Sequence, residues 1–194
     1  LDVSRFNTQN VIDMSFMFQG LHIKVLDVSK FDTSQVTDMS FMFSNADQVE
    51  LLDVKNFDTR NVEYFSGMFQ YALTLKELDV SGFDTGKAID MSYMFQLVLV
   101  SKIDVSNFDT KNVEDMYSMF AGCNYLTSLE LSNFNTKKVK DMCSMFANCR
   151  KVTILDLTSF DTSNVRDMSH MFEDCGSLTD IKGINKLNTQ SVLD

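Results

Sequence analysis

One copy of a repeating unit runs from residue 155 to residue 172 and reads LDLTSFDTSNVRDMSHMF. Its final Met-Phe pair occurs seven times, each pair 25 or 26 residues after the one before, with the methionines at Met17, Met42, Met68, Met94, Met119, Met145 and Met171. A fixed period of this length is typical of repeat proteins, in which each copy packs against its neighbours. We therefore predict a single repeat array over residues 1–194, with copies starting near residues 1, 26, 52, 78, 103, 129, 155 and 181.

Two periodicities within the unit predict its local structure. Val152, Leu155 and Leu157 alternate with polar residues, which indicates a short strand with one buried face. Val165, Met168, Met171 and Cys175 follow at spacings typical of one face of a helix. The predicted fold is therefore an α/β, leucine-rich-repeat-like, right-handed solenoid of about 26 residues per coil, with a parallel sheet on one side and short helices on the other.

A threonine preceded by Asp or Asn stands at one position of every copy, and these threonines are Thr8, Thr33, Thr59, Thr85, Thr110, Thr136, Thr162 and Thr189. Since Asp and Asn exchange freely before it, the side-chain oxygen is needed there and the charge is not. We expect an Asx or Ser/Thr turn that links the strand to the helix.

The composition limits the classes of partner. The net charge of −10 argues against nucleic acid and against docking on anionic lipid, since both need clustered Lys and Arg. No apolar run is long enough to span a membrane, so we expect no direct membrane insertion. The chain begins and ends inside a repeat, which predicts a fragment of a longer protein whose export signal or anchor lies elsewhere. Uncapped ends would permit end-to-end self-association.

A row of acidic residues is the first candidate binding surface. It lies between inward-facing strand positions and comprises Asp27, Asp53, Asp79, Asp104, Glu130 and Asp156. Stacked about 5 Å apart, these carboxylates could bind Ca²⁺ or a basic partner. They could equally keep the sheet face soluble and prevent it from stacking.

The second candidate surface is the variable position between the two methionine positions. It carries Phe16, Phe41, Gly67, Tyr93, Ser118, Ser144 and His170 in successive copies. Because this position varies while its neighbours do not, we expect it to face outward. Phe16, Phe41, Tyr93 and His170 would then form a contact strip, unless they pack against an adjacent coil or a missing segment.

Cys123, Cys149 and Cys175 share one phase in adjacent copies. A disulfide could span one coil, but Leu, Ala or Val at this phase elsewhere favours buried free thiols. A zinc site would need four converging ligands, and Cys143 lies at a different phase, so we predict no metal site. The Met-Phe ladder is predicted to be core.

The full pattern, LDVSxFDTxxVxDMSxMFxxCxxL, resembles the BspA-type leucine-rich-repeat surface proteins of bacteria, in the lipoprotein-associated repeat subfamily. The resemblance covers the whole chain and implies an exported protein, displayed on the cell surface or secreted, with a role in adhesion. The family supplies no catalytic residues, and we expect no cofactor unless the acidic row binds Ca²⁺. Three copies have the expected cysteine, and the final copy is irregular around Gly183 and Leu187.

These observations favour a non-catalytic binding module that adheres to a protein or glycan of a host or neighbouring cell. A passive spacer that presents another domain is the alternative, and ice binding through the threonine row is a remote one. No enzyme signature surrounds either of the two histidines, and we expect no enzymatic activity.

Overall fold

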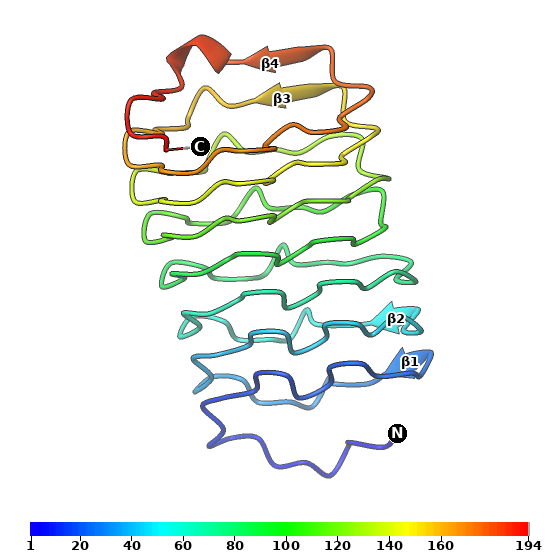
Figure 1. Cartoon of the computed structure of the whole chain (residues 1–194). Helices are drawn as coiled ribbons and strands as arrows, with labels where there is room; N and C mark the ends of the chain where they lie inside the picture. The colour runs from blue at the N-terminus through cyan, green and yellow to red at the C-terminus, as the bar shows by residue number, and fades with distance from the viewer. Residues whose placement is uncertain (194) are drawn as a thin grey trace.

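Successive copies of the repeat lie stacked on one another in the computed structural model, which describes residues 1–193 (Figure 1). We call each copy, with the boundaries given above, a coil. The first coil lies at one end of the stack and residues 181–193 lie at the other (Figure 1). The coils are therefore ordered in space as they are in the sequence.

Regular secondary structure is sparse. Strands β1 (Val25–Leu26) and β2 (Leu51–Leu52) form one parallel pair, and β3 (Ile154–Asp156) and β4 (Asp180–Lys182) form another. The 3-10 helix η1 (Ile184–Lys186) follows β4. Within residues 1–193 no helix has the length and apolar character needed to cross a lipid bilayer.

The prediction of an α/β, leucine-rich-repeat-like right-handed solenoid is wrong. Residues 1–193 contain no α-helix, and the strands form two separate two-stranded sheets rather than one sheet with a strand in every coil. The helix is excluded by backbone conformation: Phe41 has a φ of 56° and Asn45 a φ of 54°. A right-handed helix cannot contain such residues, and equivalent positive-φ residues recur in every Met-Phe segment.

The Met-Phe segment is instead a series of turns that is hydrogen-bonded to the next coil. The N–H groups of Met42 and Ser44 donate to carbonyls three residues earlier, those of Met39 and Phe41. The alternate N–H groups of Met39, Phe41 and Phe43 donate to Tyr64, Ser66 and Met68 of the next coil, at 2.7–3.0 Å. Half of the N–H groups therefore close turns within a coil, and the other half join neighbouring coils.

Isolated parallel bridges continue this pairing along the stack through Asp13, Asp38, Tyr64, Asp90, Asp115, Asp141 and Asp167. Each bridging residue stands immediately before the first methionine position of its coil. The bridges therefore set the register from which the alternating N–H donors of the Met-Phe segment follow.

The core is built from identical positions of successive coils, and the Met-Phe ladder belongs to it as predicted. Met39, Met42, Met91 and Met94 are fully buried. The phenylalanines that follow the second methionine stack on one another, with ring centroids 5.6–6.1 Å apart, from Phe18 through Phe43, Phe69, Phe95, Phe120 and Phe146 to Phe172. Burial of these large side chains is the main stabilising contribution, since each coil has little regular secondary structure.

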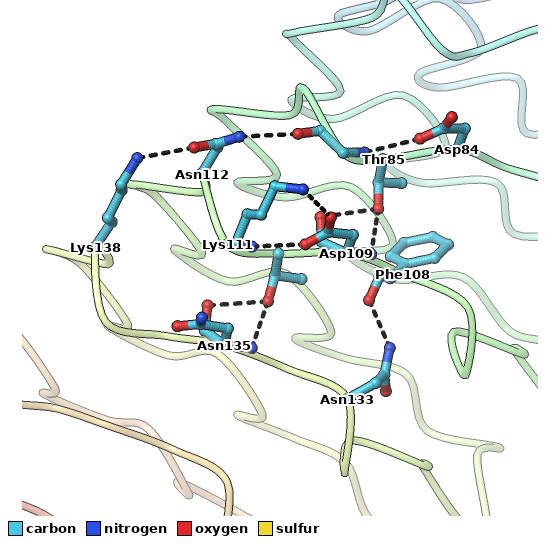
Figure 2. Close-up of polar contacts among 11 residues, drawn as sticks. Asp84, Thr85, Phe108, Asp109, Lys111, Asn112, Asn133, Asn135 and Lys138 are labelled. Atoms are coloured by element: carbon cyan, nitrogen blue, oxygen red, sulfur yellow. Dashed lines mark hydrogen bonds and ion pairs between the residues drawn. The ribbon is translucent and has the colours of Figure 1, made fainter.

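The threonine row joins coils through buried hydroxyl groups. The Thr85 hydroxyl donates to the carbonyl of Asp109 at 3.1 Å and accepts from the N–H of Asp109 at 2.8 Å (Figure 2). Thr110 makes the same pair of bonds to Asn135. The preceding Asp or Asn accepts from the N–H two residues on, as Asp84 does from Gly86, which confirms the predicted Asx turn.

Candidate binding surface

The acidic row lies on the surface, where its carboxylates close turns. Asp27, Asp53, Asp79, Asp104, Glu130 and Asp156 each accept a hydrogen bond from the backbone N–H two residues on, at 3.0–3.2 Å. Hydroxyl groups add to this in three coils, where Ser81, Ser106 and Thr158 donate to the same carboxylates. Each acidic side chain therefore has a local structural role that requires no ligand.

Lysines interrupt the negative charge of this row. Lys55 lies 3.7 Å from Asp79, Lys102 lies 3.5 Å from Asp104, and Lys182 lies 3.6 Å from Asp156. Hydrogen bonds from the Ser or Thr two residues on, together with these lysines, hold the pKa of Asp79, Asp104 and Asp156 below the usual value. Within residues 1–193 no three His, Cys, Asp or Glu residues are placed to hold a metal ion.

The predicted aromatic strip is divided into separate parts. The variable position has a positive φ in all seven Met-Phe segments, from 51° at Ser118 to 58° at Phe16 and Tyr93. Phe16 is 51% exposed and stacks on the half-buried Phe41 with ring centroids 5.1 Å apart. The Phe41 ring covers Gly67, where a Cβ atom would lie 2.3 Å from the ring. The Phe41 side chain is therefore partly exposed and also packs on the next coil, so it combines the two alternatives that the sequence left open.

The other two members of the strip have different neighbours. Tyr93 packs against Tyr117 with ring centroids 4.8 Å apart, and burial raises the pKa of Tyr93 to about 12. His170 is exposed, and its Nδ1 lies 3.1 Å from a carboxylate oxygen of Glu173. The structure brings Phe16 and Phe41 together but leaves Tyr93 and His170 in other coils.

A second row of carboxylates is formed by the bridging residues Asp90, Asp115 and Asp141, and after burial the charges of Asp115 and Asp141 contribute to the raised pKa of Tyr93. Burial, and then the charges of Asp90 and Asp141, raise the pKa of Asp115 to about 6. Burial also raises the pKa of Asp141. The aspartate at this position is not among the candidate binding residues named from the sequence. Its recurrence in six of the seven Met-Phe segments was the signal for a row.

The cysteines of residues 1–193 are free. The thiols of Cys123, Cys149 and Cys175 donate to the carbonyls of Phe95, Phe120 and Phe146 at 3.1–3.2 Å. Burial raises the pKa of all three thiols. They act as core residues that satisfy backbone carbonyls, which agrees with the free-thiol alternative.

Sequence reasoning missed a basic groove of about 650 Å³ that crosses the fifth to eighth coils. It is lined by Lys137, Lys138, Lys140, Arg166, Glu114, Asn164, Ser191 and Leu193. Four cationic side chains and one carboxylate therefore meet in a chain whose net charge is −10. The signal was the sequence Lys137-Lys138-Val139-Lys140 in an otherwise acidic repeat.

Comparison with known proteins gives a family and no established function. No curated protein matches the chain, and no solved structure matches it. The family model described as "Mycoplasma protein of unknown function, DUF285" matches twice, over residues 1–100 and residues 97–194. Because the two matches together cover the whole chain, the chain belongs to this bacterial repeat family, DUF285.

Proposed function

We propose that this chain is a non-catalytic binding module of a bacterial surface protein, which is displayed on the cell or secreted and adheres to macromolecules of a host or neighbouring cell. The family match supports a bacterial repeat protein. The finer assignment to the BspA-type leucine-rich-repeat subfamily belongs to this proposal and rests on the repeat pattern alone.

The observation that carries the proposal is the contrast between fixed and variable positions of a coil. The positive-φ position carries Phe16, Phe41, Gly67, Tyr93, Ser118, Ser144 and His170, while the Met and Phe positions beside it are nearly constant from coil to coil and mostly buried. Because the buried Met and Phe positions stay nearly constant, the side chain at the variable position can change from coil to coil without a change in the backbone. Such surfaces in repeat proteins serve for binding.

The proposal of a non-catalytic role is supported by the structural hydrogen bonds that the polar side chains form. The carboxylates of the acidic row accept turn hydrogen bonds, and the threonine hydroxyls join coils. Seven of the eight threonines of the row are buried, Thr110 and Thr136 fully so, and only Thr189 is exposed, which also counts against ice binding by this row.

The experiment is binding of the chain to an array of extracellular-matrix proteins, mucins and glycans. One variant changes Phe16 and Phe41 to Ser, and another changes Asp53, Asp79 and Asp104 to Asn, which retains the oxygen acceptor of each turn. Saturable binding that one folded variant loses would support the proposal and locate the contact surface. If the folded chain binds nothing on the array, the proposal fails and the passive spacer becomes the better explanation.

A further inference from the structure

The sixth coil supplies three cations to the basic groove and differs from the fifth coil at three positions of this surface: Asn135 stands in place of Asp109, Lys138 in place of Asn112 and Lys140 in place of Glu114. In the fifth coil Lys111 lies 2.6 Å from the carboxylate of Asp109, so the two charges cancel (Figure 2). The residue equivalent to Asp109 in the sixth coil is Asn135, whose Oδ1 accepts from the N–H of Lys137 at 3.1 Å. The turn is retained without its negative charge, so Lys137 has no carboxylate within its own turn.

The surrounding side chains leave a net positive charge. Lys140 pairs with Glu114, and the Lys138 ammonium donates to Oδ1 of Asn112 at 2.8 Å. Within residues 1–193, Lys137 and Arg166 form no salt bridge. Among the described residues that line the groove, four cations and one carboxylate sum to a net charge of about +3, and after the hydrogen bonds from Ser163 the charge of Lys137 also helps to lower the pKa of Asp161. A concentrated positive charge in an acidic protein selects for a ligand with several anionic groups at short range.

The remaining lining residues narrow the class of ligand. Asn164 and Ser191 contribute an amide and a hydroxyl group, and among the described residues that line the groove only Leu193 has a wholly apolar side chain. A protein partner would need a more apolar interface centre, and a single-stranded nucleic acid would need aromatic rings on which its bases stack. The long-range repulsion from a net charge of −10 also opposes an extended polyanion such as duplex DNA.

We infer that the groove lined by Lys137, Lys138, Lys140 and Arg166 binds a sulfated saccharide, with the sulfate groups on the cations and the sugar hydroxyls on Asn164 and Ser191. This inference rests on the proposed binding function and names its ligand class. The acidic remainder of the chain restricts the contact to a short saccharide segment.

The test uses a heparin-derived octasaccharide and the same octasaccharide after desulfation, with binding followed by calorimetry. The main variant changes Lys137, Lys138 and Arg166 to Ser, and a matched variant removes three cations outside the groove, those of Lys30, Lys55 and Lys102. A third variant, Asn135→Asp, restores the carboxylate found at Asp109 and retains the turn acceptor. Thermal unfolding of each variant establishes that it is folded.

We expect the sulfated octasaccharide to bind about 100-fold more weakly to the main variant, and within about threefold of the native affinity to the matched variant. Asn135→Asp should weaken binding by about three- to tenfold, since it adds one like charge beside the sulfate groups. Desulfation should abolish binding to the native chain.

Equal loss in the main and matched variants, or no binding of the sulfated octasaccharide by the native chain, would overturn the inference. Displacement of the octasaccharide by a low concentration of single-stranded oligonucleotide or polyglutamate would show that the ligand class is wrong. The array of matrix proteins, mucins and glycans separates this failure from failure of the proposed function. If the chain binds another component of the array, the proposed binding function still holds. If it binds no component, the proposed function fails as well.

Discussion

Residues with positive φ stand at the same two places in successive coils, and glycine at two of them is enclosed by a side chain from a neighbouring coil. A Cβ on Gly67 would lie 2.3 Å from the Phe41 ring, and one on Gly122 would lie 2.6 Å from Cδ2 of Leu97. For residues other than glycine this conformation costs about 1–2 kcal/mol. The inter-coil hydrogen bonds of the Met-Phe segment offset this cost where Phe16 or Tyr93 adopts it.

The change Gly67→Ala should destabilise the chain by about 3 kcal/mol, since it adds left-handed strain and a clash with the Phe41 ring. Gly20→Ala is the matched control: its φ is 67° and no atom lies within 4 Å of the added Cβ. It should cost about 1 kcal/mol. Urea unfolding measures both, and the double change with Phe41→Ala should cost less than the sum of the single changes. Equal costs for the two alanines would contradict this account of the Gly67 site.

Asp115→Asn should stabilise the chain at neutral pH. Burial raises the pKa of Asp115 from 3.8 to about 6, so its contribution to stability is fully present below pH 3.8 and is lost as pH rises through 6. Asparagine retains the acceptor for the Tyr117 N–H and carries no charge. After a discount for its partial exposure, we expect a gain of about 1 kcal/mol near pH 8 and little change near pH 4.

The control for this experiment is Asp27→Asn. Its pKa is lowered by hydrogen bonds from Ser29, so its favourable contribution is present above the unfolded pKa and is lost as pH falls through the folded one. Loss of this charge should therefore slightly destabilise the chain at neutral pH. Urea unfolding at the two pH values compares the variants, and a gain from Asp115→Asn that did not depend on pH would rule out the buried charge as its cause.

The Met-Phe segment shows at the scale of one element why periodicity predicted a helix. Positions three apart face the same side in a helix, and they also face the same side at the two ends of a β-turn. Met39 and Met42 are the ends of such a turn, closed by the bond from the Met42 N–H to the Met39 carbonyl. The burial of both methionines was predictable from spacing, but the backbone between them was not, because Phe41 gives no sequence signal for a positive φ.

Thr110→Val should destabilise the chain by about 2–3 kcal/mol, because the N–H and carbonyl of Asn135 would both lose a buried partner. Thr110→Ser retains the hydroxyl and should cost about 1 kcal/mol or less. The change Thr127→Val, at an exposed threonine whose hydroxyl forms no hydrogen bond within residues 1–193, controls for the substitution itself. Urea unfolding of the three variants tests the role of the hydroxyl, and equal stability of the Thr110→Val and Thr110→Ser chains would refute it.

At the scale of the whole molecule, the sequence predicted the repeat array correctly but predicted the fold class wrongly. The period of the Met-Phe pairs correctly placed Met91, Phe95 and Cys123 in a continuous core. The alternation of Val152, Leu155 and Leu157 correctly predicted burial, but β3 and β4 form a local pair and not part of a continuous sheet. Lys137, Lys138 and Lys140 are nearly contiguous, but the basic groove was missed because Glu114 and Arg166 join them only across coils, 23 or more positions away, and because the average charge of the chain is negative.

Cysteine labelling tests the order of packing along the stack. Cys123 and Cys149 are fully buried, whereas Cys175 is partly exposed. We expect iodoacetamide to modify Cys175 at least about tenfold faster than Cys123 in the native chain, since access to Cys123 requires coils to separate. Mass spectrometry over time measures the rates, and the urea-unfolded chain, in which the cysteines should react at similar rates, is the control. A native Cys123 that reacted as fast as Cys175 would show that the central core opens readily.

The alternating N–H donors of the Met-Phe segments give the stack a direction. From the first coil to the seventh, these bonds run from the earlier coil to the later one, as from Met14 to Asp38 and from Met142 to Asp167. Within the Met-Phe segment, one face of a coil is therefore a row of donors and the opposite face is a row of acceptors, whereas N–H groups just before the segment, such as that of Thr37, donate to the earlier coil. A coil cannot be inverted within such an array, and two arrays cannot meet through matching ends related by a twofold axis. Any association through this ladder has to join unlike ends, head to tail, and the product is a polar filament rather than a closed pair.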